Sequence, residues 1–376
     1  MLSFWERNSL INYDYIIVGS GIVGLCTAHY IKKDFPSARV AVLERGLLPS
    51  GASTRNAGFA CMGSLSELVA HANEEGTDAM ALLFEQRYKG LKRLLSIIPP
   101  EQCGYHQAGS HELLFAEHLP VLEHLDEFNK VLQSILGREA FLVASNRLPD
   151  MQFASVAALI ENTGEGQLDS GLLLRSLIDL VQQQGVDIKT GCTVMQLEEQ
   201  ASGVDVVCQA SGFEAISFHA RNVILCTNAF TKQFLPEADV VPGRGQVLIT
   251  KPLPALPFKG IFHFEEGYYY FREYQGRVLF GGGRQLDKAG ETSTAFELHE
   301  TIQADLLEKL HTIILPHVDV DIDMRWSGIM AFGEEKKPMV QAVSQHILVA
   351  ARMSGMGVAL GSEVAWQVSR LLKERV

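Results

Sequence analysis

Three glycines at fixed spacing are the first residues of this 376-residue chain whose pattern points to chemistry. Gly19, Gly21 and Gly24 form the motif G-x-G-x-x-G, with Ile22 and Val23 between the last two. In such a motif the first glycine allows a tight turn, the second lets a pyrophosphate approach the backbone, and the third lets a helix pack close to a strand. The free N–H groups at the start of that helix favour phosphate. The motif therefore predicts a dinucleotide site.

Glu44 is the second residue with a chemical role in this pattern. It stands 20 residues after Gly24, at the end of an apolar run at 39–43. A carboxylate at this place accepts hydrogen bonds from a ribose 2′-hydroxyl and repels a 2′-phosphate. The residue therefore disfavours NADP, while the motif itself does not separate NAD from FAD.

A strand–helix–strand unit must hold these residues in place. Residues 13–18 form a short apolar run before Gly19, residues 22–33 are apolar on most faces of a helix, and residues 39–43 form the second strand. Such a β–α–β unit normally belongs to a parallel sheet. The glycine motif alone is a weak signal, because 33 of the 376 residues are glycine. Its place between a strand and a helix makes the signal strong.

The next part of the chain continues this α/β pattern. Ser64 and Glu67 form a capping-box pattern for a helix that runs towards residue 99 and is interrupted at Gly76. Asp169 opens another helix, for which Gly185 is the terminating residue. We also expect a helix at 119–136 and strands at 112–115, 186–189, 194–198, 204–210, 215–220 and 222–227.

Residues 240–325 differ from the rest of the chain in their pattern of apolar and aromatic residues. They contain alternating or aromatic segments that predict long antiparallel strands, at 246–251, 267–273 and 277–282. The elements expected after them are a helix at 294–314, a strand at 346–351, a glycine-rich loop at 354–361, and a helix at 362–374 with Ser362 as its N-cap. The fold class is therefore α/β, with a nucleotide domain built from separated segments and a second domain, with an antiparallel sheet, inserted into it.

Composition and charge exclude several classes of protein. With 47% apolar and 20% charged residues the chain is neither disordered nor a small disulfide scaffold. A net charge of −12 argues against nucleic acid as a partner. The six cysteines show no CxxC spacing and the twelve histidines no HExxH spacing, so we expect no metal site. We find no signal peptide and no transmembrane stretch, and we expect a cytoplasmic protein with reduced thiols.

A resemblance to a known family separates FAD from NAD. Glu44-Arg45-Gly46 and the loop at 51–58 (GASTRNAG) resemble the second signature of the D-amino acid oxidase (DAO) family of FAD enzymes, which includes glycine oxidase and sarcosine oxidase. The tail of the match and the N-terminal SFWER lean towards the amine and γ-glutamylputrescine oxidoreductases of that family. The resemblance continues in family order through GQLDSGLLLRSLIDLVQQQGVDI, NVILCTNAF, VPGRGQ, YYYFREYQGRVLFGGGR, RWSGIMAF and SGMGV.

The resemblance implies a Rossmann-like FAD-binding domain of the GR2 type with an inserted α+β substrate domain. The first would comprise residues 1–90, 150–235 and 325–376, and the second residues 91–149 and 236–324. Non-covalent FAD is expected, because the flavin-linking histidine and cysteine positions of some relatives are not matched. Besides the glycine motif and Glu44, the implied cofactor-binding residues are Arg45, Ser53, Thr54, Arg55, Asn56, Ala57, Gly58, Val194, Thr227, Asn228, Gly355, Met356, Gly357 and Val358.

The sequence departs from the family where many members hold a substrate carboxylate. Met330 stands in the turn after the Trp-x-Gly motif, where an arginine is usual, and Arg352 stands where a glycine is usual. Arg352 or Arg325 is a candidate replacement, since a guanidinium forms a bidentate pair with a carboxylate, but each is equally well explained as a structural ion-pair partner. Tyr268 and Tyr270 share one face of a strand, and either line the substrate pocket or pack within the sheet.

The leading hypothesis is an FAD-dependent oxidoreductase that oxidises a C–N bond of an amine or amino acid by hydride transfer to flavin N5. Oxygen or another acceptor would then take the electrons, and no acid–base residue is required. Three alternatives stay open: a hydroxy-acid or glycerol-phosphate dehydrogenase on the same fold, an enzyme that modifies the wobble uridine of tRNA, and a flavin-binding subunit that needs a partner. The acidic charge argues against the tRNA alternative.

Overall fold

The expected β–α–β unit is present in the computed structural model, which describes residues 2–210 and 212–375. It consists of β1 (Asn12–Val18), α2 (Ile22–Asp34) and β2 (Val40–Leu43). The two strands pair in parallel, with Ile17 opposite Val42. Both residues are fully buried, as expected for parallel strands that are covered on both faces.

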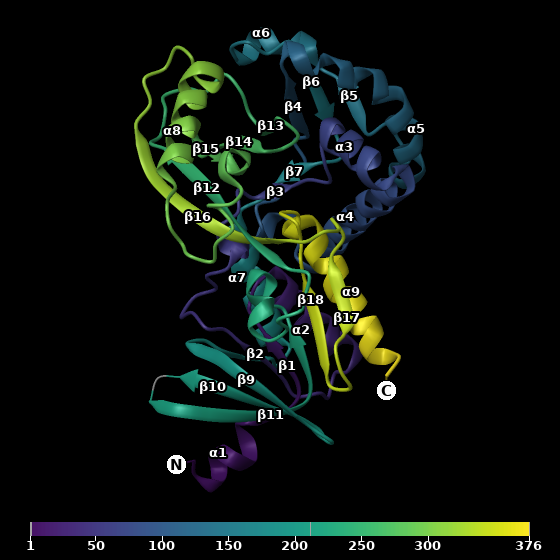
Figure 1. The fold of residues 1–376 in the computed structure, drawn as a ribbon, viewed down its shortest axis with the longest axis vertical. Helices are drawn as coiled ribbons and strands as arrows, with labels where there is room; N and C mark the ends of the chain where they lie inside the picture. The colour runs from purple at the N-terminus through teal and green to yellow at the C-terminus, as the bar shows by residue number, and fades with distance from the viewer. Residues whose placement is uncertain (1, 211, 376) are drawn as a thin grey trace.

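This unit forms the centre of the first eight-stranded sheet, in the lower part of Figure 1. The strand order is β17-β18-β11-β1-β2-β8, and β10 and β9 extend from β11 as an antiparallel meander. The added strands are β8 (Asp187–Lys189), β9 (Cys192–Gln200), β10 (Gly203–Ala210), β11 (Phe213–Leu225), β17 (Met339–Ala342) and β18 (Ile347–Ala351).

Helices cover one face of the parallel strands. The hydrophobic core on this face joins side chains of α2, α4 (Thr77–Ile97), α7 (Ser170–Gln183) and α9 (Gly357–Lys373) with β1 and β2. Gly90 of α4 allows a close approach, because a Cβ there would lie 2.0 Å from the Ala359 carbonyl oxygen of α9. The N-terminal turns of α2 and α9 also meet, since a Cβ on Gly361 would lie 2.8 Å from Cγ2 of Ile22.

The second eight-stranded sheet occupies the upper part of the molecule, with strand order β16-β12-β15-β14-β13-β4-β6-β5 (Figure 1). All its pairs are antiparallel except that of β13 and β4. α8 (Glu300–Lys309) packs on one face over a core rich in phenylalanine. The strands are β4 (Ser110–Leu114), β5 (Phe141–Val143), β6 (Ala158–Asn162), β12 (Val241–Thr250), β13 (Ile261–Phe264), β14 (Tyr269–Tyr274), β15 (Arg277–Gly282) and β16 (Ile322–Phe332).

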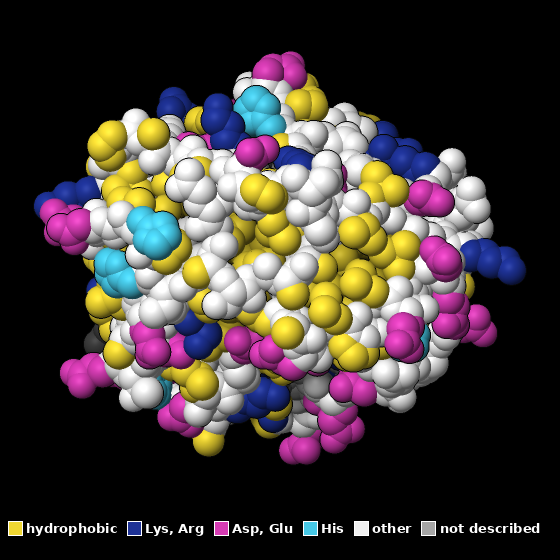
Figure 2. Space-filling view, turned by 90° about the horizontal axis from the view of Figure 1, so that it is seen from above, with side chains coloured by type: hydrophobic (Ala, Val, Ile, Leu, Met, Phe, Trp, Pro, Cys, Tyr) yellow, Lys and Arg dark blue, Asp and Glu magenta, His cyan; other side chains and the backbone are white. Residues whose placement is uncertain are grey.

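Shorter elements complete the fold. They are α1 (Phe4–Ser9), α3 (Leu65–Glu75), α5 (Leu125–Leu136), α6 (Leu148–Met151), and the small pair of β3 (Phe59–Ala60) and β7 (Gly166–Gln167). Seen from above, charged side chains lie mostly around the margin of the molecule, whereas apolar side chains gather over the middle (Figure 2). Within the described ranges, no helix is both long and apolar enough to cross a membrane.

Several expected boundaries were wrong, each because tertiary packing overrides a local signal. The two strands expected at 215–220 and 222–227 form one strand, β11, which pairs with β10 through its first half and with β1 through its second. The helix expected at 294–314 begins only at Glu300, and the one expected at 119–136 begins as a 3-10 segment at 116–124. β13 was not expected at all, because a strand of only four residues, IFHF, gives little pattern.

The last helix was predicted to begin at Ser362 but begins at Gly357. Its N-cap is Met356, and Ser362 lies fully buried within the helix, where its hydroxyl is 3.0 Å from that of Tyr30. Contact with α2 and α4 offsets the cost of two helical glycines. The division into cofactor and substrate domains stays a proposal. The expected cofactor domain includes β6 and most of β16, but both strands belong to the second sheet. Domains divided by sheet would therefore have two different boundaries.

Candidate active site

A cavity of about 700 Å³ is lined by residues of both sheets. Most of the residues expected to bind cofactor or substrate contribute to its wall. Those that line it are Gly19, Gly21, Ile22, Val23, Glu44, Arg45, Ser53, Arg55, Asn56, Ala57, Val194, Thr227, Asn228, Tyr268, Tyr270, Met330, Gly355, Met356, Gly357 and Val358. Five expected residues are not part of the wall, namely Gly24, Thr54, Gly58, Arg325 and Arg352.

The three glycines of the motif differ in what surrounds them. Gly19 has φ +107°, and a Cβ there would lie 2.7 Å from the Cys226 carbonyl oxygen. A Cβ on Gly24 would lie 1.9 Å from the Gly19 carbonyl oxygen, so any side chain would separate α2 from the turn. Gly21 lies at the cavity wall, and a Cβ there would lie 2.8 Å from the Ser53 hydroxyl. Gly19 thus allows the turn, Gly21 faces the cavity, and Gly24 lets α2 pack against the turn.

Glu44 lies at the end of β2 and is buried. Its Oε2 accepts hydrogen bonds from the Ser20 backbone N–H at 3.1 Å and from the Ser20 hydroxyl at 2.7 Å. Its Oε1 accepts one from the Gly46 N–H at 3.0 Å. The carboxylate therefore also fixes the glycine turn to the end of β2, a role that the sequence did not indicate.

The loop at 51–58 is held from the second sheet. Arg272 of β14 is almost fully buried and donates to the backbone carbonyls of Ala57, Gly58 and Leu168 at 2.7–3.0 Å. Trp326 of β16 donates its ring N–H to the Arg55 carbonyl at 3.0 Å. A loop that lies against the first sheet is thereby positioned by strands of the second.

The chain before α9 adopts several left-handed conformations. Arg352, Ser354 and Gly355 have φ +64°, +47° and +83°, and Asn228 on the neighbouring segment has φ +45°. After glycine, asparagine is among the residues that adopt a positive φ most readily. Strained conformations of this kind tend to collect at functional sites. Here they direct the N-terminal end of α9, with its free N–H groups, to the cavity.

These features fit a dinucleotide. A cradle that Cβ atoms would fill, two helix N-termini and a buried carboxylate at a strand end all border the same cavity. The residues around Val194 line the wall beside the glycine turn, where an adenine would lie in the expected arrangement. FAD, the cofactor implied by the loop at 51–58, therefore has a matching site in this structure.

The other end of the cavity is built on the second sheet. Tyr268 and Tyr270 line it, whereas Tyr269 between them points into the core and donates to Asp305 at 2.7 Å. The Tyr270 ring lies over Gly281, because a Cβ there would be 2.7 Å from the ring. Burial raises the pKa of the Tyr270 hydroxyl to about 12, so it stays a neutral hydrogen-bond donor.

Arg352 and Arg325 are engaged away from the cavity. The guanidinium of Arg352 is paired with Asp239, donates from Nε to the Lys337 carbonyl at 3.1 Å, and lies 3.6 Å from Glu335. Arg325 donates to the Gln303 side chain at 2.5 Å. Of the two interpretations of Arg352, these contacts favour the structural ion pair over the substrate clamp.

Sequence reasoning missed other polar residues of the cavity wall, among them Arg284, Lys288, His263 and Glu165. Burial lowers the pKa of His263 to about 3, so the ring is neutral. Burial raises the pKa of Glu165 to about 7, although the N–H groups of Met62 and Gly63 and the Ser110 hydroxyl donate to it. These residues come from three separate segments, so no spacing pattern could have grouped them.

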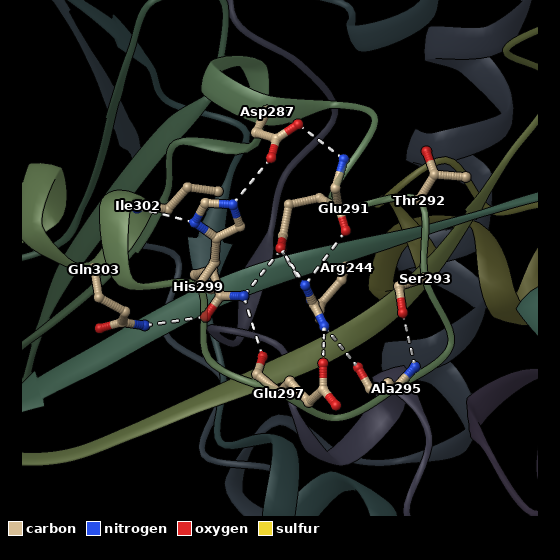
Figure 3. Close-up of polar contacts among 12 residues, drawn as sticks. Arg244, Asp287, Glu291, Thr292, Ser293, Ala295, Glu297, His299, Ile302 and Gln303 are labelled. Carbon is tan, nitrogen blue, oxygen red and sulfur yellow. Dashed lines mark hydrogen bonds and ion pairs between the residues drawn. The ribbon is translucent and has the colours of Figure 1, made fainter.

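Arg284 and Lys288 lie at the start of a long loop, residues 284–299, which is fixed to β12 (Figure 3). β15 ends at Gly282, and the loop then takes its place beside β12, where the Arg244 N–H donates to the Glu291 carbonyl at 2.7 Å. The buried side chains of these two residues also pair, at 2.7 Å and 3.0 Å. Gln246 donates to the second Glu291 oxygen at 2.9 Å, so the loop has a fixed course.

Comparison with known proteins gives a consistent result. The family model "FAD dependent oxidoreductase" (DAO) matches residues 14–371. N-methyl-L-tryptophan oxidase of Yersinia pestis (strain Pestoides F) is 25% identical over 239 residues, which are 62% of this chain and only 58% of that relative.

Solved structures share the fold at lower identity. Glycine oxidase from Geobacillus kaustophilus has a TM-score of 0.76 at 20% identity and covers 97% of this chain and 95% of its own. L-proline dehydrogenase from P. horikoshii has a TM-score of 0.76 at 15% identity, with 97% and 94% covered. L-amino acid deaminase from Proteus myxofaciens, solved with anthranilate, has a TM-score of 0.74 at 17% identity, with 97% and 91% covered.

Proposed function

Because this chain belongs to the DAO family of FAD-dependent oxidoreductases, we propose that it oxidises a carbon–nitrogen bond of an amine or an amino acid. Bound FAD would supply the electron acceptor, by taking a hydride from the carbon that carries the nitrogen. One observation carries the proposal: the dinucleotide cradle and the tyrosine-lined end belong to a single cavity. A cofactor held in the cradle and a substrate at the other end would therefore meet without an intervening barrier.

We assign the cofactor contacts by their place in the cavity. The N-terminal turn of α2, at Gly21 to Val23, would hold the pyrophosphate, and Glu44 the ribose. The backbone N–H groups at the start of α9 would face the ring system, where a donor stabilises negative charge. FAD would be held without a covalent bond.

The chain's own part in the reaction is to position the substrate and exclude water. The wall at the substrate end combines Tyr268, Tyr270 and Met330 with the glycines of β12 and β15. In such surroundings an amine is favoured in its neutral form, which has the free electron pair that hydride loss requires. The neutral Tyr270 hydroxyl and the neutral His263 ring add polar contacts without adding charge.

The test is anaerobic reduction of the bound flavin. Reduction is measured as the loss of flavin absorbance near its long-wavelength maximum. Amines, N-methylated and unsubstituted amino acids, and hydroxy acids would be screened in parallel. Bleaching by at least one amine or amino acid, and by no hydroxy acid, is the expected result. Reduction by hydroxy acids or glycerol phosphate alone would overturn the proposal and select the alternative dehydrogenase function.

A further inference from the structure

Arg284 enters the cavity without an anionic partner. Among the described residues it takes part in no ion pair, since the Glu291 carboxylate that acts on it is already paired with Arg244, and its buried Nε has no hydrogen-bond partner. The guanidinium carbon lies over the Phe332 ring, 4.3 Å from its centre. The side chain is half-buried. Leaving a partly desolvated charge without a partner is costly, which makes a partner from outside the chain the simplest explanation for its position.

Two other cations of the cavity wall already have partners. Arg87 pairs with Glu67 at 2.9 Å, and Lys336 pairs with Glu74 at 2.7 Å. These pairs neutralise the charges locally, so neither cation is free for a ligand.

The remaining arginines of the wall also differ from Arg284. Arg55 donates to the backbone carbonyls of Ser50 and Ser327 at 3.2 Å and 3.0 Å. Arg45 is exposed, follows Glu44 at the ribose end, and stacks on Phe230. Arg284 is therefore the arginine that combines a buried Nε without a hydrogen-bond partner, a contact with the Phe332 ring and a position at the substrate end.

Its surroundings place it beside the residues expected to face the substrate. A Cβ on Gly243 would lie 2.9 Å from Nε of Arg284, and a Cβ on Gly245 would lie 3.0 Å from the Met330 methyl group. The two glycines share one face of β12 and are roughly 7 Å apart. Met330 in turn approaches the start of α9, because a Cβ on Gly355 would be 3.6 Å from its sulfur.

We propose that Arg284 is the anion-binding residue of the substrate cavity and that the substrate is an amine that also carries a carboxylate. The inference rests on the proposed function, since it names the group by which that substrate is held. A single planar guanidinium matches a carboxylate in a bidentate pair. The neighbouring Tyr270 hydroxyl is a second donor on the same face, because a Cβ on Gly245 would lie 3.9 Å from its oxygen. Glu266 lines the same cavity and disfavours a dianion such as phosphate.

Calorimetric titration of the FAD-loaded protein tests the proposal without turnover. The probes are acetate, anthranilate, its uncharged analogue 2-aminobenzamide, and inorganic phosphate. The variants are Arg284→Met, Arg284→Lys and, as a matched control, Arg277→Met. Arg277 lies at the other end of β15, pairs with Asp323 and does not line the cavity.

We expect wild type to bind anthranilate, and Arg284→Met to weaken this binding roughly thirtyfold or more. Arg284→Lys should recover part of the affinity, and Arg277→Met should bind as wild type does. 2-Aminobenzamide should bind wild type and Arg284→Met equally, and the FAD content of all variants should be unchanged.

Four results would overturn the proposal. They are no carboxylate binding by wild type, equal binding by Arg284→Met, phosphate binding tighter than either carboxylate, and loss of FAD from Arg284→Met. Anaerobic flavin reduction separates this failure from that of the proposed function. If amines without a carboxylate reduce the flavin of wild type and of Arg284→Met equally, the proposed function is supported and the proposed anion site is wrong. If Arg284 binds carboxylates but no amine reduces the flavin, the anion site stands and the function falls.

Discussion

The two ends of the cavity are built by different means. The cofactor end is made mainly of backbone: a glycine turn, two helix N-termini and a loop whose carbonyls are held by Arg272. The substrate end is made of side chains that project from separate strands and loops of the second sheet. Backbone sites depend on local conformation and therefore tolerate few residue types. Side-chain sites depend on contacts between distant segments. Single side chains in such a site can therefore be replaced without a change in the backbone fold.

The largest effect is expected where the backbone leaves no room. Gly24→Ala would place a methyl group 1.9 Å from the Gly19 carbonyl oxygen. We expect loss of bound FAD and destabilisation by about 3 kcal/mol or more. Gly51→Ala is the matched control for the unfolding temperature alone, because a Cβ there meets nothing within 4 Å, whereas Gly51 itself lines the cavity. Flavin absorbance per protein and the unfolding temperature measure both effects. Retention of FAD by Gly24→Ala would show that the cofactor end does not depend on close backbone packing, which contradicts the contrast with the substrate end.

A substitution of Arg352 tests whether this residue stabilises the fold or binds the substrate. Arg352→Met would leave Asp239 without its partner, and we expect a loss of about 3 kcal/mol in the free energy of unfolding, the lower end for a buried pair because Asp239 is partly exposed. Anthranilate affinity of the folded, FAD-loaded variant should stay within a factor of about two of wild type. Denaturant unfolding and calorimetry give the two values. A selective loss of anthranilate binding would return Arg352 to the substrate site.

Two buried glutamates, Glu165 and Glu112, should make the stability of the fold depend on pH. Burial raises the pKa of Glu165 and of Glu112 to about 7, so the folded state favours their protonated forms. Their stabilising contribution is present below the unfolded value near 4.5 and is lost as the pH rises through 7. For Glu165 the loss is at most about 3 kcal/mol.

Glu165→Gln keeps the group neutral and should flatten the fall in unfolding temperature between pH 5 and pH 8. The exposed Glu101→Gln is the control and should leave the slope as it is in wild type. An unchanged slope in Glu165→Gln would show that this carboxyl group is ionised throughout.

The smallest effect is expected for Glu44, the side chain to which the ribose is assigned. Glu44→Ala should weaken FAD binding by about 1–3 kcal/mol. Glu44→Gln should cost less, because one amide oxygen still accepts from the Ser20 or Gly46 N–H. Titration of apoprotein with FAD, followed by flavin fluorescence, gives both values. FAD binding that neither substitution alters would remove Glu44 from the cofactor site.

The same contrast explains what could be predicted from the sequence. The turn at Gly19, the helix after it, Glu44 and the loop at 51–58 are each specified within a few residues, so their patterns were visible. Arg284 follows three glycines at the end of β15, and nothing in that pattern shows that it lies over Gly243, 41 residues earlier. The exchange of arginine for Met330 and of glycine for Arg352 was visible too. Its interpretation stayed open between a substrate clamp and an ion pair, because the sequence does not show that Asp239 lies beside Arg352.

The order of strands in the first sheet has a consequence for synthesis on the ribosome. β1 lies between β2 and β11, and β11 needs β18, yet some 330 residues separate β1 from β18 in the chain. Contacts between such distant segments form slowly, and an incomplete sheet exposes apolar strand edges. The nucleotide cradle therefore cannot close until the helix that follows β18 has emerged, and the nascent chain must be kept from aggregating until then. Free flavin available at that moment would act as a late folding ligand, since it binds only the completed form.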